Sequence, residues 1–198
     1  DKQGRFHVAG VLVDPAAQNE NSIADWILKQ HEIVLSDGVL HWKDEFRNGA
    51  ELNLEQVDFA MKNRGRRHKF RMTAVPDSQL TGSLDIRGNL LHPRFADKIS
   101  DISRWKGELY VDMSGVDMAE WKRLADFPIG LISGRGAVQA WLTLDEFQLT
   151  GLTADIDGED IRLKMEATLP QLDLLKASGR LSIQKTGRPP LVKGAEAK

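Results

Sequence analysis

Hydrophobic and polar residues alternate one by one along most of the chain, which is the pattern of β-strands with one buried face. In "LTGSLDIRGNLL", residues 80–91, Leu84 and Ile86 alternate with polar neighbours between two glycines. The same glycine-led phrase recurs at irregular intervals, as "GVLHW" from Gly38, "GELYVDM" from Gly107, "GAVQAWLTL" from Gly136 and "GRLSI" from Gly179. So many half-apolar strands predict a large sheet with one apolar face.

The alternation predicts about nine or ten strands joined by short links. They cover 5–13, the two halves of 31–46 around an Asp-Gly turn, 50–63, 69–75, 80–91, 107–113, 136–144, 147–156, 161–169 and 179–184. Links this short favour antiparallel hairpins over parallel crossovers. The alternation slips by one residue at Glu55 and Gln56, as it does at a β-bulge.

Two short helices are predicted between these strands, at residues 22–30 and 117–127. Each begins with a capping pair, S-x-x-D in the first and D-x-x-E in the second, ahead of an apolar stripe. A single helical turn is predicted within 169–178, and another within 92–105, which has no clear period and is otherwise a loop.

The predicted fold class is therefore mainly β, a large curved antiparallel sheet with two or three short helices. No shift in composition divides the chain, so residues 1–184 are predicted to form a single β-rich segment. The tail 185–198, "KTGRPPLVKGAEAK", is polar and contains Gly and Pro, and it is predicted to be flexible.

Composition narrows the class of protein. The 198 residues are 41% hydrophobic and 28% charged, as in folded globular proteins. A net charge of −2 argues against a nucleic-acid-binding protein with a broad basic surface. The absence of cysteine excludes a disulfide scaffold and thiolate metal sites. The chain begins at Asp1 without an initiator Met or a signal-peptide core, so we expect it to be a piece of a longer polypeptide.

No motif in the sequence predicts catalysis, and we expect neither an enzyme nor a bound cofactor or metal. The five histidines lie apart in the sequence, at His7, His31, His41, His68 and His92, without the spacing of metal ligands. "DIDGEDIRLKME", residues 155–166, has carboxylates at calcium-loop positions but an Asp where that loop requires Gly. Its flanks alternate like strands, so a hairpin turn with solvated acids is the preferred interpretation.

The basic stretch "NRGRRHK", residues 63–69, is the one concentrated positive patch in the sequence. It is predicted to form the tip of a hairpin. A solvated turn is the ordinary interpretation of such a tip, and the alternative is contact with lipid phosphates or another anionic partner. The residues that would make this contact are Arg64, Arg66, Arg67 and Lys69.

An apolar sheet face of this size must be covered by something. A second layer of the same protein would make an ordinary core, whereas a curved sheet could hold acyl chains, and the residue pattern leaves both open. Two short helices are too small to cover the face. Its residues include Leu52, Leu54, Phe59, Phe70, Met72, Leu84, Ile86, Leu109, Val111, Leu142 and Leu144.

The order of phrases from about Asp25 to Ile183 resembles the YhdP branch of the AsmA-like proteins. The chain has "DGVLHWKDE", "LNLEQV", "NRGRRHKF", "LTGSLDIRG" and "WKGELY" in that order, followed by "DMAEW". The resemblance implies a Gram-negative envelope protein, anchored in the inner membrane by a segment absent from this chain and lying mostly in the periplasm. It implies a repeating β-groove that guides phospholipid between the inner and outer membranes.

Under this resemblance the apolar residues named above become candidate groove-lining residues, and the implied partners are phospholipid and the rest of the same long polypeptide, with other envelope proteins as further candidates. The runner-up hypothesis is a structural envelope module that packs against neighbours without binding lipid. A glycan-active enzyme comes third, because Trp42, Trp105, Trp121 and Trp141 are dispersed along the sequence.

Overall fold

The structure is a computed structural model. It describes residues 6–8, 11–13, 23–43, 51–76, 82–96, 98–117, 119, 131–164 and 170–185. Its elements in chain order are β1 (Phe6–Val8), β2 (Val11–Val13), α1 (Ile23–Lys29), β3 (Glu32–Lys43), β4 (Glu51–Arg64), β5 (Arg67–Pro76), β6 (Ser83–Leu91), the 3₁₀ turn η1 (Ile102–Arg104), β7 (Lys106–Asp117), β8 (Leu131–Asp145), β9 (Gln148–Leu163) and β10 (Leu172–Gln184).

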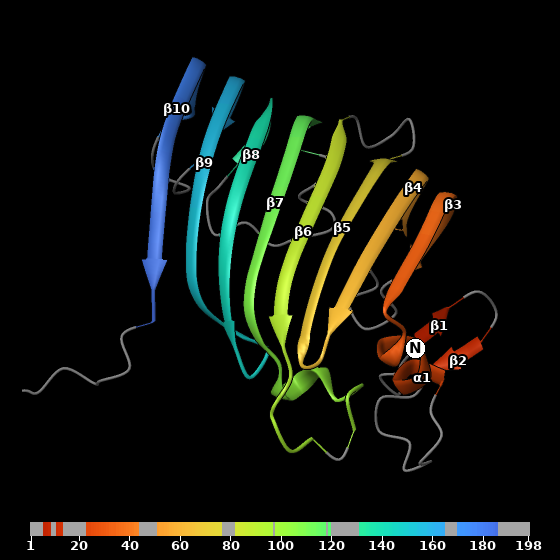
Figure 1. Ribbon diagram of the computed structural model, residues 1–198. Coiled ribbons are helices and arrows are strands. Elements are labelled where there is room, and N and C mark those ends of the chain that lie inside the picture. The colour runs from red at the N-terminus through yellow and green to blue at the C-terminus, as the bar shows by residue number, and fades with distance from the viewer. Residues whose placement is uncertain are drawn as a thin grey trace, which may run out of the picture.

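Strands β3 to β10 form one eight-stranded antiparallel sheet in which each strand pairs with its neighbours in the sequence. Figure 1 shows this sheet as a bent layer with β3 and β10 at opposite edges, so it does not close into a barrel. β1 and β2 pair with each other in a separate small hairpin. We call the end with the β4–β5 and β8–β9 turns the lower end, as it lies in Figure 1, and the other the upper end.

The predicted mainly β, antiparallel architecture is confirmed, but the helix content is lower than predicted. The described residues contain one α-helix, α1, and the η1 turn, where two or three short helices were expected. The helix expected over 117–127 lies outside the described residues apart from Asp117 and Ala119. The expected tail likewise lies outside them apart from Lys185.

The helical turn predicted within 169–178 is wrong, because β10 already begins at Leu172. Leu172 and Leu174 pair with Leu163 and Ile161 of β9, so this segment extends the sheet. The lost strand alternation has a local cause: the pairing skips Leu175, which is 87% exposed. The irregular segment resembled a helical turn because its side chains do not keep a period of two.

Three predicted strand boundaries are also wrong. The expected strand over 5–13 is the hairpin of β1 and β2. The predicted Asp-Gly turn is a bulge inside the continuous strand β3, where Asp37 has φ 53° and its backbone N–H donates to Asp58 Oδ1 at 3.0 Å. The turn expected after Ile156 is likewise a bulge, at Asp160 with φ 52°, so β9 continues to Leu163. A local positive φ changes the register of each strand without reversing it.

The bulge predicted at Glu55 and Gln56 is confirmed. Gln56 has φ 50°, and the β4–β5 pairing shifts between Glu55 and Asp58. The extra residue returns the apolar side chains of β4 to the same face, so Leu54 and Val57 both join the buried cluster with Ala74.

Two glycines of the repeated phrase have structural causes. Gly107 has φ 147°, and a Cβ added there would lie 2.2 Å from the carbonyl oxygen of Asn89. Gly88 pairs directly with Phe70, whose ring lies across it, and an added Cβ would lie 2.1 Å from the ring. At these two positions glycine is needed because a neighbouring strand or ring approaches too closely for a side chain.

We expect Gly88→Ala to lower the free energy of unfolding by about 1–3 kcal/mol, because the Phe70 ring must move to make room for the added methyl group. Gly179→Ala is the matched control, since an added Cβ at Gly179 meets no atom within 4 Å and should be neutral or slightly stabilising. Urea denaturation of both variants measures the difference. Equal losses for the two would contradict the steric explanation.

Candidate functional site

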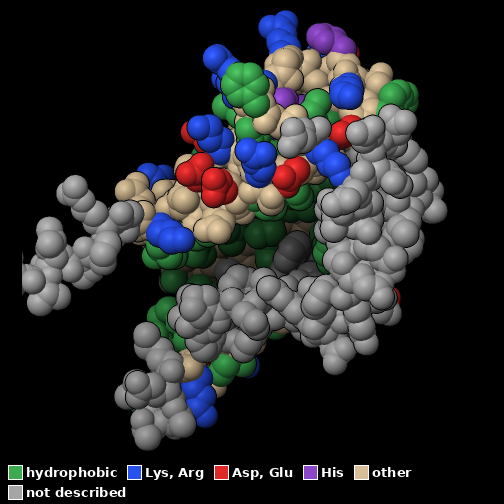
Figure 2. All heavy atoms as spheres, turned by 90° about the horizontal axis from the view of Figure 1, so that it is seen from below, with side chains coloured by type: hydrophobic (Ala, Val, Ile, Leu, Met, Phe, Trp, Pro, Cys, Tyr) green, Lys and Arg blue, Asp and Glu red, His purple; other side chains and the backbone are tan. Residues whose placement is uncertain are grey.

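The inner face of the sheet carries unbroken apolar rows, because residues that pair across neighbouring strands share a face. One row contains an apolar residue from each of the eight strands, in the order Leu35, Phe59, Met72, Ile86, Val111, Ala140, Ala154 and Leu181. Seen from the lower end, the molecule is hollowed, and hydrophobic side chains gather inside the hollow (Figure 2). We call this face the apolar groove.

The structure places all the predicted lining residues on this one face, although their contact with lipid remains a prediction. Leu54, Leu84 and Leu144 are already buried in clusters within the protein. The others are half-buried: Leu52, Phe59, Phe70, Met72, Ile86, Leu109, Val111 and Leu142. The half-buried residues are therefore the ones available to a ligand.

The two edge strands extend the apolar groove beyond the predicted residues. Leu40 and Trp42 of β3 pair with lining residues of β4 and are 41% and 44% exposed. Leu181 and Ile183 of β10 continue the rows at the other edge and are 47% and 54% exposed. The sequence prediction omitted them because it did not determine which strands lie at the edges.

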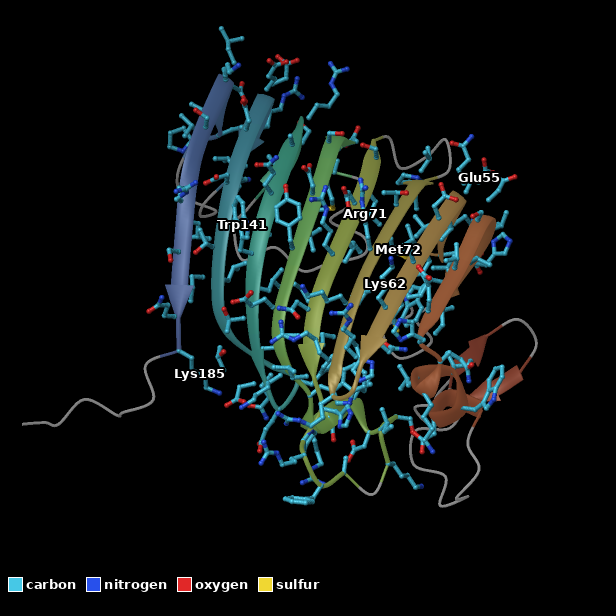
Figure 3. The ribbon with its side chains drawn as sticks, viewed as in Figure 1. Glu55, Lys62, Arg71, Met72, Trp141 and Lys185 are labelled. Carbon is cyan, nitrogen blue, oxygen red and sulfur yellow. The ribbon has the colours of Figure 1, made fainter. Side chains whose placement is uncertain are left out.

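The outer face is polar and carries its own ion pairs. Asp85 accepts hydrogen bonds from Arg87 Nη2 at 2.7 Å and from Arg71 Nη2 at 2.9 Å. These bonds, that from Arg87 foremost, hold the pKa of Asp85 below its usual value. Figure 3 shows Arg71 and Trp141 on this face, where Trp141 lies 5.3 Å from Tyr110 between ring centroids. The sheet thus has one polar, solvated face and one apolar face.

The lower part of the apolar groove is covered by α1 together with residues 92–96 and 98–105, which we call the cap. Leu28 of α1, Ile99 and Trp105 pack against lining residues of the sheet, among them Leu90 and Leu144. Trp105 is only 4% exposed. The Asp25 carboxylate accepts a hydrogen bond from the backbone N–H of Ser100 at 2.7 Å, which joins the two parts of the cap.

A polar network under the cap holds it to β4 and β5. The ring of His68 stacks on Trp105 with centroids 4.4 Å apart. Asn63 Nδ2 donates to the carbonyl of Gln30 at 2.6 Å, so its Oδ1 is the acceptor facing His68 Nδ1, 2.7 Å away. His68 therefore carries its proton on Nδ1, and its buried Nε2 has no hydrogen-bond partner among the described residues.

Burial lowers the pKa of His68 from 6.5 to about 4, and the adjacent His92 adds to the effect. Protonation would place an N–H on Nε2 where the described residues offer no acceptor. His68 and His92 lie far apart in the sequence, without the spacing of a metal site. They are 5.4 Å apart between ring centroids, because the ends of β5 and β6 meet. No spacing motif in the sequence could have indicated this.

The basic stretch 63–69 forms the β4–β5 turn at the lower end, as predicted. Arg64, Arg67 and Lys69 are exposed, and Arg66 also donates from Nη1 to the carbonyl of His92 at 3.2 Å. Asn63 and His68, at the ends of the same stretch, are buried. The turn therefore has two roles, since its ends hold the cap and its tip presents cations to solvent.

The family model described as "YhdP protein" matches residues 2–192. The chain belongs to the YhdP family. No curated protein and no solved structure matched the chain. The sequence resemblance to the YhdP branch is thus confirmed, and the curved open sheet with one apolar face is the architecture of this YhdP-family chain.

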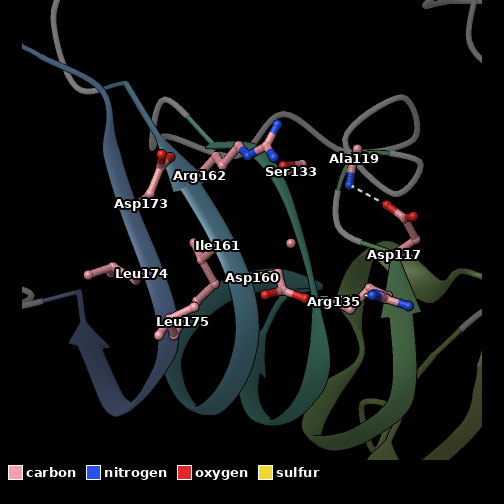
Figure 4. A pocket seen from close by; sticks show the side chains of 11 residues that line it. Asp117, Ala119, Ser133, Arg135, Asp160, Ile161, Arg162, Asp173, Leu174 and Leu175 are labelled. Carbon is pink, nitrogen blue, oxygen red and sulfur yellow. Dashed lines mark hydrogen bonds and ion pairs between the residues drawn. The ribbon is translucent and has the colours of Figure 1, made fainter.

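At the upper end, this YhdP-family chain has a pocket of about 490 Å³ formed by the ends of β7 to β10 (Figure 4). Ile161 and Leu174 supply apolar surface to it. Its charges are of both signs, and Arg135 lies 3.6 Å from Asp160, Nη2 to Oδ2.

The described part of the chain contains no group of three or more His, Asp or Glu residues arranged to hold a metal ion. None of its helices is both long and apolar enough to span a bilayer.

Proposed function

We propose that this chain is a periplasmic segment of an AsmA-like envelope protein, whose apolar groove holds the acyl chains of phospholipid in transit between the inner and outer membranes. Under this proposal the chain is tethered to the inner membrane through another part of the same polypeptide. The observation that carries the proposal is the apolar row with one member from every strand of the sheet. Membership of the YhdP family supports it.

The dimensions of the row suit an acyl chain. Neighbouring strands are about 4.8 Å apart, so a row across eight strands extends roughly 34 Å along the sheet. One leaflet contributes about half of the ~30 Å hydrocarbon core of a bilayer. The row is therefore longer than one lipid tail, so a bound tail can move along it from one strand to the next.

The energetics suit passive guidance. Each CH₂ group removed from water gains about 0.8 kcal/mol, so a continuous apolar surface lowers the barrier to carrying a tail through an aqueous compartment. Half-buried residues such as Phe59, Ile86 and Val111 offer this surface. The charged head group stays solvated at the open side. The proposal includes no catalytic step and no cofactor, because guidance requires burial alone.

The test is native mass spectrometry with lipid extraction on the chain purified from a Gram-negative host. We expect phospholipid to co-purify with the wild type and to fall at least about ten-fold in the double variant Ile86→Asp/Val111→Asp, because the paired charges oppose burial of a tail. Ala60→Asp/Thr143→Asp is the matched control, which adds the same charge at exposed outer-face positions. Circular dichroism establishes that each variant is folded.

A folded wild-type chain that carries no lipid, and takes none up from liposomes, would contradict the proposal. The second candidate function, a structural envelope module, would then be preferred. It is favoured by Leu54, Leu84 and Leu144, which are buried without any ligand, and by the open edge strands β3 and β10. Such edges can pair with further strands.

A further inference from the structure

Positive charge is concentrated in two segments of the chain. Residues 62–69 and 92–106 contain nine Lys and Arg residues and two Asp residues, although the whole chain has a net charge of −2. The rest of the chain is therefore clearly acidic. A charge separation of this size orients a protein toward an anionic surface.

The fold brings these two segments together at the lower end. The backbone N–H of His92 donates to the carbonyl of Arg66 at 3.1 Å, and the Arg66 side chain donates back to the carbonyl of His92. The β8–β9 turn joins them through a hydrogen bond from Phe147 N–H to the Trp105 carbonyl at 2.8 Å. Figure 2, which views the molecule from this end, shows Lys and Arg side chains gathered there with Asp, Glu and hydrophobic side chains among them.

Several large apolar side chains project from this same end instead of packing inward. Phe95 is 87% exposed, Trp26 of α1 is 64% exposed and Phe147 is 46% exposed. They come from three different segments: the loop after β6, α1 and the β8–β9 turn. Exposed aromatic residues from separate loops, set among cations, are typical of surfaces that lie in the interface of a membrane.

We propose that this lower end, the basic β4–β5 turn with Phe95, Trp26 and Phe147, is a docking surface for an anionic bilayer. Cations at the β4–β5 turn attract acidic head groups, and the aromatic side chains insert at head-group depth. Each basic residue near an anionic membrane contributes roughly five-fold in affinity, and added salt weakens this attraction.

This docking surface is distinct from the apolar groove. It lies on the outer side of the cap and uses exposed side chains, whereas the groove uses half-buried residues of the sheet. The inference rests on the proposed envelope function and extends it. A segment that guides lipid and lies against a bilayer can take up lipid directly from that bilayer. The two can fail separately, since the groove binds single lipid molecules and the lower end binds a surface.

Co-sedimentation of the full chain with vesicles tests the inference. The probes are phosphatidylcholine vesicles with and without about 30% phosphatidylglycerol. We expect binding to the anionic vesicles only, with about ten-fold or greater loss in Arg64→Ser/Arg67→Ser and several-fold loss in Phe95→Ser. These residues are exposed, so the variants should fold.

Matched controls stand at the opposite end. Arg162→Ser/Lys164→Ser removes two exposed cations, and Leu175→Ser removes a side chain as exposed as Phe95, at 87%. Both should bind anionic vesicles like the wild type. Equal losses in control and lower-end variants, or equal binding to neutral vesicles, overturn the proposal. Failure of the wild type to bind any vesicle also overturns it.

Disrupting the apolar groove should give a different result from disrupting the lower end. Ile86→Asp/Val111→Asp should lose co-purified phospholipid yet sediment with anionic vesicles like the wild type. If both variant sets lost both properties together, the separate docking surface would be refuted.

Discussion

Replacing Trp105 with alanine should lower the free energy of unfolding by about 3–5 kcal/mol, the cost of emptying a large aromatic site in a core. Trp105 is 4% exposed, stacks on His68, and donates from Nε1 to the carbonyl of Ile99 at 2.9 Å. For a chain of this length the melting temperature should fall by about 2–4 °C for each kcal/mol. Thermal and urea unfolding measure the loss.

Trp141→Ala is the matched control, because Trp141 is 41% exposed on the outer face and should cost about 1 kcal/mol or less. Hydrogen exchange adds a spatial test. With the Trp105 side chain gone, α1 and residues 98–105 should lose protection before the central strands do. Similar effects of the two tryptophan substitutions would show that the cap is not anchored through Trp105.

Acid should destabilise the protein by roughly 3 kcal/mol between pH 6.5 and 4, through His68. The pKa of His68 is about 4 in the folded protein, against an ordinary value of 6.5. Between these values the unfolded chain binds the proton and the folded one does not, so acid favours unfolding. The contribution is fully present above pH 6.5 and is lost as the pH falls toward 4.

Urea denaturation across this pH range measures the slope. His68→Gln should flatten it between pH 6.5 and 4. The ion-paired carboxylates act in a different window. Arg180 holds the pKa of Asp155 below its ordinary 3.8, so that pair is lost only at lower pH. A slope unchanged by His68→Gln would refute the assignment to this residue.

The alternation of side chains was sufficient to predict the apolar face, because a period of two needs only neighbouring residues. Ile86 and Val111 were each assigned to that face from their own strands, and the register pairs them. The bulge at Gln56 was predictable for the same reason, since it appears as a slip in the period.

The cap could not be predicted, because its contacts join residues far apart in the sequence. Asn63, His68 and Trp105 meet only because the β4–β5 turn and the loop before β7 occupy the same end of the sheet. The bulges at Asp37 and Asp160 were misread as turns, since a residue with positive φ has the same sequence preferences in both settings. Pairing with the neighbouring strands determines whether such a residue forms a bulge or a turn.

The pairing of each strand with its sequence neighbours alone makes the sheet nearly one-dimensional. In such an arrangement the stability is close to a sum of strand terms and nearest-neighbour terms, and the loops that must close during folding are short. Duplicating or deleting one hairpin would therefore lengthen or shorten the apolar rows without disturbing the rest of the register. The length of the apolar groove can thus be changed one hairpin at a time.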